Sequence, residues 1–208
     1  MTVDIIYYIN LDHREDRKKE FINWVSESKF NGVVERIPAI YKKNKGYIGC
    51  TMSHIKALET FLNSNYETCI IYEDDYQPND IENYWDNIDK LSRENIKFDI
   101  ILLSFNDYNL EIVDTNYDFL KKITFTYTTS GYIIRKQFAN ILLEAFKECL
   151  HLCLEEEKIT NHNTERYCID VYWMKLMKMY NFYCFYPRMG KQRESYSDVL
   201  DKIVDYKC

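Results

Sequence analysis

The feature that most constrains the fold is an alternation of apolar, strand-like runs with amphipathic, helix-like segments along the whole chain. Strand patterns lie at about 3–10, 33–38, 68–72, 98–104, 123–134 (one or two strands around Gly131) and 183–186. Helical spacing covers about 14–29, 51–62, 79–93, 136–155 and 169–180, and we expect a turn from Gly46 to Gly49. Such alternation predicts an α/β fold with a mostly parallel central sheet flanked by helices.

Composition supports one globular domain over residues 1–208 and disfavours several other classes. With 46% hydrophobic and 29% charged residues and no low-complexity tract, the chain is neither disordered nor fibrous. A formal net charge of −6 argues against nucleic acid as a partner. No run approaches about 18 apolar residues, and no signal-peptide pattern opens the chain. We therefore expect a cytoplasmic protein without a transmembrane segment, with a place at a membrane periphery or in a viral factory as open alternatives. Seven cysteines without a CxxC pair are typical of free thiols.

Three consecutive carboxylates, Glu73, Asp74 and Asp75, follow the apolar strand at 68–72, and no Lys or Arg is adjacent in the sequence. In sheets of this class, ligands bind beyond the carboxyl ends of the strands. Three ionised carboxylates repel one another, and a hard divalent cation such as Mg²⁺ or Mn²⁺ relieves that repulsion. Alternate strand side chains share a side, so Glu73 and Asp75 are the expected chelating pair, with Asp74 in support. A solvated acidic turn is the alternative.

Two further segments place polar residues at helix starts. Asn10 and Leu11 follow the first strand, and Arg14 and Arg17 open the next helix, where backbone N–H groups favour anions. The two guanidinium groups are suited either to bind a phosphate or to pair with nearby acids. Small residues and hydroxyls in 49–54, including Ser53, permit close approach of a ligand, and His54 is a candidate donor to it. The alternatives are an ordinary charged first turn and a histidine with a local partner.

The motifs described above, together with several later segments, occur along the chain in an order that resembles glycosyltransferase family 25. This family contains bacterial lipooligosaccharide galactosyltransferases and procollagen galactosyltransferases. The resemblance covers nearly the whole chain and rests on Ile9–Arg17 (INLDHREDR), Glu35–Ile40, Gly49–His54, Ile71–Asp75, Asp99–Ser104, Thr129–Ile134, Ile169-Asp170, and Pro187 with the tail at 192–198. The chain is shorter than many members of the family, which leaves the acceptor open.

The resemblance implies a GT-A-like fold, a UDP-sugar donor, Mn²⁺ as the usual metal on Glu73, Asp74 and Asp75, and transfer with inversion. The expected reaction moves a hexose, galactose or glucose, to a hydroxyl of a glycan or hydroxylysine-type acceptor on protein or lipid. The nucleotide-side half would be about 1–105, the acceptor-side half about 106–187, and 188–208 is a candidate lid. Residues expected to bind the donor are Asn10, Leu11, Arg14, Arg17, Ser53, His54, Ser130, Gly131, Arg188 and Gln192.

Inversion also requires a base for the acceptor hydroxyl. Asp170 matches the acidic residue of the family at this place, and an ordinary helix N-cap is its alternative role. Tyr132 and Trp173 are the aromatic side chains expected to stack on the acceptor sugar, with core packing as the alternative.

Other classes remain as rivals. A nucleotidyltransferase would open with a glycine-rich phosphate loop, which does not follow the first strand, and a phosphatase would need Asp74 as its nucleophile. The last rival is a catalytically inactive module that binds a nucleotide-sugar or a carbohydrate but transfers no sugar.

Overall fold

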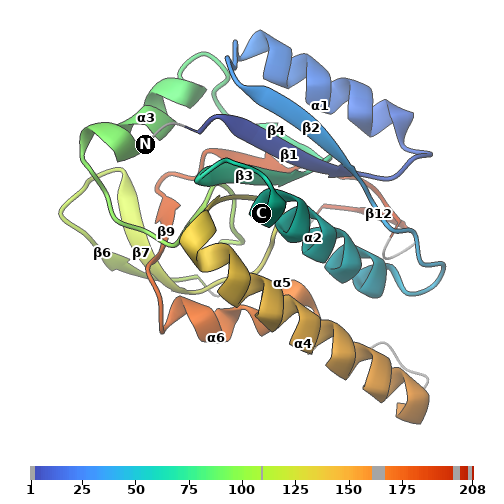
Figure 1. Cartoon of the computed structure of the whole chain (residues 1–208). Coiled ribbons are helices and arrows are strands. Elements are labelled where there is room, and N and C mark those ends of the chain that lie inside the picture. The colour runs from blue at the N-terminus through green and yellow to red at the C-terminus, as the bar shows by residue number, and fades with distance from the viewer. Residues whose placement is uncertain (1–2, 109, 161–166, 199–201, 206–207) are drawn as a thin grey trace.

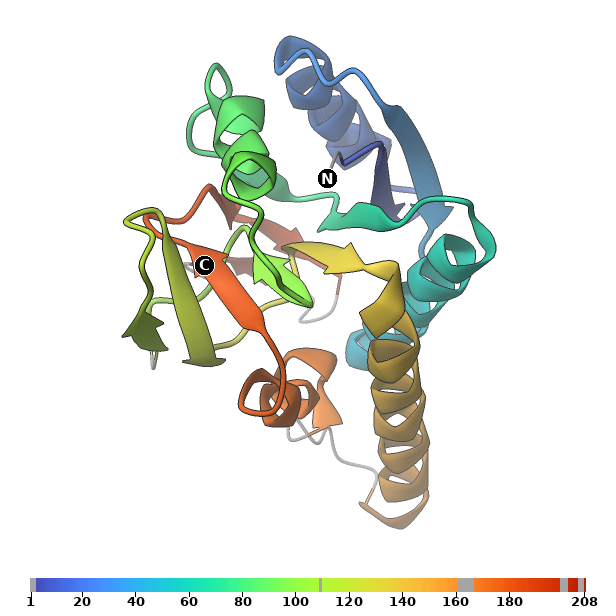
Figure 2. The ribbon, with the colours of Figure 1, turned by 60° about the vertical axis from the view of Figure 1, so that its left-hand side comes forward.

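The computed structural model describes residues 3–108, 110–160, 167–198, 202–205 and 208. These residues form three layers, a central sheet with helices on both faces (Figures 1 and 2). The eight strands of the sheet lie in the order β2-β1-β3-β8-β5-β9-β7-β6. Their bounds are β1 Ile5–Asn10, β2 Val33–Pro38, β3 Thr68–Glu73, β5 Ile100–Leu102, β6 Glu111–Asp114, β7 Leu120–Phe125, β8 Gly131–Arg135 and β9 Phe182–Phe185.

Six helices and two small ribbons complete the described structure. The helices are α1 Glu15–Glu27, α2 Gly46–Asn63, α3 Tyr84–Arg93, α4 Lys136–Thr160, α5 Ile169–Tyr172 and α6 Met174–Met177. One ribbon pairs β4 (Tyr76–Pro78) with β10 (Gly190–Gln192), and the other pairs β11 (Ser195–Ser197) with β12 (Lys202–Val204). No helix in the described ranges is both long and apolar enough to cross a membrane.

The strand directions confirm the predicted α/β architecture. β1 pairs in parallel with β2 and β3, and β5 pairs in parallel with β9. β8 lies antiparallel between β3 and β5, and β7 lies antiparallel between β9 and β6. Six of the eight strands therefore point the same way, which makes the sheet mostly parallel and brings the carboxyl ends of β1 and β3 together.

The core has two halves because alternate strand residues face opposite layers. In β1, Tyr7 packs toward α2 and α4 on one face, in a cluster that includes Phe61 of α2. Tyr8 faces α1 and α3 and stacks on Phe21 of α1 with 4.6 Å between ring centroids. All six residues of β1 are buried, as expected for a strand covered on both faces.

Several predicted boundaries are wrong. Gly46 to Gly49 form the first turn of α2 rather than a separate turn, and Gly49 lies so close to Ile40 that an added Cβ would be 2.3 Å from the Ile40 carbonyl oxygen. The helix expected from residue 79 begins at Tyr84, because the Asp80 carboxylate accepts the backbone N–H of Asn83 and 76–78 form β4.

Later elements differ as well. The helix expected at 169–180 is divided into α5 and α6, and α4 continues past residue 155 to Thr160. The tail, for which the sequence predicted no strands, contributes β10 to a ribbon with β4 and also forms β11 and β12. Its chain returns across the carboxyl ends of β1 and β3.

Candidate active site

The acidic motif lies at the carboxyl end of β3. Glu73 is the last residue of the strand, and its backbone N–H donates to the Ser130 carbonyl oxygen at 2.9 Å. The backbone N–H of Asp74 donates to the Ile9 carbonyl oxygen at 3.1 Å, so the motif leaves the sheet between β1 and β8. This is the edge where α/β proteins bind ligands.

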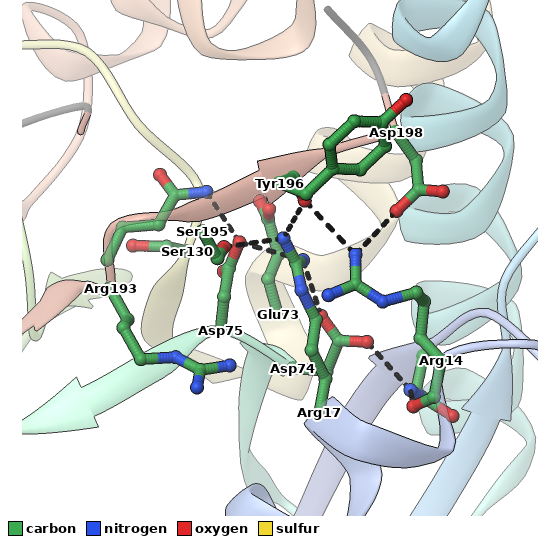
Figure 3. A network of polar contacts seen from close by, with 12 residues as sticks. Arg14, Arg17, Glu73, Asp74, Asp75, Ser130, Arg193, Ser195, Tyr196 and Asp198 are labelled. Atoms are coloured by element: carbon green, nitrogen blue, oxygen red, sulfur yellow. Dashed lines mark hydrogen bonds and ion pairs between the residues drawn. The ribbon is translucent and has the colours of Figure 1, made fainter. Parts of the chain in front are cut away.

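Arg17 of α1 neutralises the motif from the side. Its Nη1 atom donates to Asp74 Oδ1 at 3.0 Å and to Asp75 Oδ2 at 2.9 Å, and all three side chains are buried (Figure 3). Its Nη2 atom donates to Ser195 Oγ and to the Tyr196 carbonyl oxygen, both at 2.7 Å. The motif has no cation adjacent in sequence, but the fold supplies one. Arg17 lines the site, yet both of its Nη atoms already have partners.

Asn10 supports the motif from the end of β1. Its amide Nδ2 donates to Asp74 Oδ2 at 2.7 Å, and Arg36 from β2 donates to Asn10 Oδ1 at 2.8 Å. Both oxygens of Asp74 therefore accept protein hydrogen bonds, one from Asn10 and one from Arg17. Asp74 is held as a structural partner of these two side chains.

Asp75 differs because one of its oxygens has no partner. Oδ2 accepts from Arg17 and from Gln192 Nε2 at 3.1 Å, but the buried Oδ1 atom has no hydrogen bond. Burial, together with the charges of Glu73 and Asp74, raises the pKa of Asp75 to about 7 despite the Arg17 guanidinium. A buried carboxylate oxygen without a donor is costly, and a bound cation would satisfy it.

Glu73 and His54 meet on the other side of the motif. Thr129 Oγ1 donates to Glu73 Oε1 at 2.9 Å, and His54 Nε2 is 3.4 Å from the same oxygen. His54 Nδ1 is hydrogen bonded to the Tyr132 hydroxyl at 3.1 Å. His54 is completely buried, so its contacts are fixed by the fold.

A cavity of about 420 Å³ lies over these groups. Of the predicted site residues, it is lined by Leu11, Arg17, Ser53, His54, Glu73, Asp74, Asp75, Asp170 and Gln192. These residues come from both halves of the chain and from the tail, so the fold brings most of the predicted site together.

Asp170 faces this cavity from the first turn of α5. The N-cap residue of α5 is Cys168, so Asp170 does not fill that position. Burial and the nearby charge of Glu73 raise the pKa of Asp170, although the backbone N–H groups of Thr128 and Val171 favour the carboxylate. Thr128 has a φ of 85°, a sparsely populated conformation for a β-branched residue, and it belongs to the cavity wall.

Other predicted donor residues lie beside the cavity. Arg14 donates to Asp198 Oδ2 at 2.8 Å, and this contact connects the tail to the start of α1 (Figure 3). Arg14 also donates to Asp16. Ser130 is hydrogen bonded to Ser104, and Gly131 packs under the rings of Tyr72 and Tyr76. Arg188 donates to the Phe105 carbonyl oxygen and pairs with Asp107. Asn10, Arg14, Ser130, Gly131 and Arg188 do not line the cavity, and Ser53 uses its hydroxyl for the Ile40 N–H and the Gly49 carbonyl oxygen.

The two predicted acceptor-stacking residues lie in the core. Tyr132 and Trp173 are each fully buried, with their rings 5.5 Å apart between centroids. Stacking on a sugar requires an exposed ring face, which neither has, so the structure gives both a packing role instead. Tyr132 lies in the buried strand β8, and Trp173, between α5 and α6, packs against the rings of Tyr132, Phe146 and Phe182.

Sequence reasoning missed part of the wall. Aromatic side chains of Tyr41 and Tyr127 line the cavity, as do Thr128, Thr129, Cys50 and Asp198. Tyr41 is 55% exposed, so its ring is available to a ligand. No periodic pattern in the sequence singled out these two tyrosines.

The chain is an α/β protein with an acidic cavity at the carboxyl ends of its strands. The family model described as glycosyltransferase family 25 (LPS biosynthesis protein) matches residues 42–162, more than half of the chain. The protein therefore belongs to this family and is a glycosyltransferase. No curated protein matches the chain.

Solved structures resemble it at low identity. Mannose-1-phosphate geranyltransferase from Thermus thermophilus aligns with a TM-score of 0.46 at 8% identity, over 89% of this chain and 74% of that one. The glycosyltransferase GlyE of Streptococcus pneumoniae gives 0.45 at 6%, over 88% and 45%. UDP-glucose pyrophosphorylase gives 0.48 at 8%, over 88% and 72%. At these scores the likeness does not bear on substrate or mechanism.

Proposed function

We propose that the protein transfers a hexose, galactose or glucose, from a UDP-sugar to a hydroxyl of a glycan or hydroxylysine-type acceptor, with inversion and with a divalent metal. The observation that carries the proposal is that Asp170 and the acidic motif line the same cavity although they are nearly 100 residues apart in the chain. An inverting transfer needs a carboxylate base and a site for the leaving diphosphate within the space of one sugar.

The residues present fit a metal ion at the motif. Asp75 offers a buried oxygen without a hydrogen bond, and Glu73 offers a carboxylate that lines the same cavity. Asp74 is committed to Asn10 and Arg17, so its role in the proposal is to position Arg17 beside Asp75. Mn²⁺ or Mg²⁺ held by Asp75 and Glu73 would neutralise charge on the departing UDP.

The chain's own residues would supply binding and proton transfer. Tyr41 and Tyr127 line the cavity with aromatic rings, and such rings pack well against sugars and nucleobases, the role first expected of Tyr132 and Trp173. Gln192 and Asp198 of the tail line the cavity, which supports a lid role for the tail in this proposal. Asp170 would take the proton of the acceptor hydroxyl.

A panel of UDP-sugars tests this proposal. We expect release of UDP from one sugar by the wild type with Mn²⁺, little release with EDTA, and loss of release in Asp75→Ala. Asp80→Ala, which removes an exposed carboxylate outside the cavity, is the matched control and should keep the activity. Failure of every UDP-sugar to bind in the presence of Mn²⁺ would overturn the proposal for UDP donors. Binding without release, with or without an acceptor, would favour the inactive binding module.

A further inference from the structure

Cys50, His54 and Glu73 form a compact cluster at the cavity wall. Cys50 and His54 are four residues apart on α2 and therefore share one face of the helix. Glu73 reaches the same point from the end of β3, and the thiol, imidazole and carboxylate ligand atoms all lie within 4.8 Å of one another. Within the described ranges this is the one group of three such side chains at metal-binding separation.

The His54 imidazole gives a second, independent indication of a ligand. Its Nε2 atom is buried and has no hydrogen-bond partner, although it lies 3.4 Å from Glu73 Oε1. A buried polar atom without a partner costs about 1–3 kcal/mol. The atom points into the cluster, where an ion bound between the three side chains would satisfy it.

Supporting contacts fix the orientation of two of the three groups. The Tyr132 hydroxyl is 3.1 Å from His54 Nδ1, so an imidazole that binds through Nε2 would donate its Nδ1 proton to this oxygen. Thr129 Oγ1 donates to Glu73 Oε1. Hydrogen bonds of this kind to the non-ligating side of histidine and to carboxylates are typical of metal sites.

The donor set identifies the class of metal. Sulfur, nitrogen and oxygen from three side chains suit Zn²⁺ and other borderline cations, whereas Mn²⁺ and Mg²⁺ prefer oxygen alone. We propose that Cys50, His54 and Glu73 bind a Zn²⁺-class cation with an open position toward the cavity. Binding would release the thiol proton to solvent and form the metal–sulfur bond. Glu73 is also a ligand in the metal site proposed for the transfer, whereas Cys50 and His54 are not. Variants of Cys50 and His54, tested without sugar or nucleotide, therefore report on this site and not on the proposed transfer.

Cobalt substitution tests the site directly on the full chain. Co²⁺ added to the metal-free protein without nucleotide should produce a thiolate-to-cobalt charge-transfer band in the near ultraviolet. Cys50→Ser should abolish that band, and His54→Ala should weaken Co²⁺ binding by roughly tenfold or more. Cys168→Ser, which removes another cysteine of the cavity wall, is the matched control and should keep the band. Absence of the band in the wild type, its persistence in Cys50→Ser, or its loss in Cys168→Ser would overturn the proposal.

A second measurement needs no variant, so it holds even where Cys50→Ser fails to fold. Alkylation of wild-type thiols, mapped residue by residue by mass spectrometry, should slow at Cys50 by at least tenfold when Zn²⁺ is added. Mg²⁺ at the same concentration should leave the rate unchanged. Equal alkylation of Cys50 with and without Zn²⁺ would contradict a metal–sulfur bond there.

Discussion

Arg17 and Asp75 are 58 residues apart in the chain, yet they form a 2.9 Å ion pair between two buried side chains. The same Nη1 atom also contacts Asp74, so one guanidinium neutralises two adjacent carboxylates. This arrangement explains how consecutive acids can be buried at a strand end. It leaves the Oδ1 atom of Asp75, a residue of the cavity wall, without a hydrogen bond.

Replacement of Arg17 by methionine should strongly destabilise the fold. The variant leaves Asp74 and Asp75 buried without their cation, and breaking a buried pair costs about 3–5 kcal/mol. Urea unfolding at neutral pH measures the loss. Lys18→Met is the neighbouring control, because its pair with Glu15 is exposed and worth at most about 1 kcal/mol. Similar decreases in the free energy of unfolding of the two variants would show that the buried pair contributes no more to stability than the exposed one.

The sequence predicted the position of the acidic motif but did not single out Arg17 as its partner. A short apolar run that ends in acids places Glu73 and Asp75 at the carboxyl end of a strand. In α/β folds this end of the sheet is where ligands bind, so the sequence alone indicates the position. Arg17 was expected either to bind a phosphate, since a helix start favours anions, or to pair with nearby acids, and in the structure it pairs with Asp74 and Asp75. Which carboxylates a helix side chain reaches depends on how α1 packs over β1 and β3, and apolar spacing fixes only the buried face of the helix.

Aromatic residues show the same limit. Tyr132 lies in a strand covered on both faces, so its ring is buried whichever way it points. Tyr41 lies in the loop before α2, where no periodic pattern reports orientation. The strands of the tail could not be predicted from the sequence, because β11 and β12 have three residues each and are too short for alternation to be recognised.

Asp198 should hold the tail against α1. Its carboxylate accepts from Arg14 Nη1 at 2.8 Å and lies 2.9 Å from His13 Nε2. Asp198→Asn removes the charge, and a hydrogen bond to a charged group is worth about 1.5–3 kcal/mol, so amide exchange in Ser195–Ser197 should accelerate roughly tenfold to a hundredfold. Asp16→Asn, which removes the exposed partner of the same Arg14, should change exchange much less. Equal exchange in both variants would contradict this role.

Acid should loosen the tail in the same way. Burial opposes ionisation of Asp198, but the hydrogen bonds from His13 and Arg14 more than offset it, so the pKa of Asp198 is lowered. A lowered pKa means that the contribution to stability is present above the ordinary carboxylate pKa and is lost as pH falls through the lowered value. Exchange of the same amides, measured against pH after correction for intrinsic rates, should therefore accelerate in the wild type at acid pH and not in Asp198→Asn.

Gly49→Ala should destabilise the start of α2. Alanine gains about 1 kcal/mol of helix propensity over glycine, but its Cβ would lie 2.3 Å from the Ile40 carbonyl oxygen, which is backbone and cannot swing away. Overpacking of this kind costs about 1–3 kcal/mol. Thermal unfolding measures the balance, with exposed Glu59→Ala on the same helix as the control. An increase in Tm for Gly49→Ala would show that the loop before α2 gives way without cost.

Asp170→Asn should abolish transfer while leaving UDP affinity with Mn²⁺ nearly unchanged. Loss of a general base costs about 10²–10⁴-fold in kcat. Burial, with the charge of Glu73, raises the pKa of Asp170, so its base form is lost as pH falls through the raised pKa, and the wild-type kcat should fall with it. The same raised pKa means that ionised Asp170 lowers stability at neutral pH, so the asparagine variant should be at least as stable as the wild type there. Activity assays over a pH series, paired with urea unfolding and with the exposed-carboxylate control Asp118→Asn, separate the two effects. Retained activity in Asp170→Asn would assign this carboxylate to the structure of α5 instead.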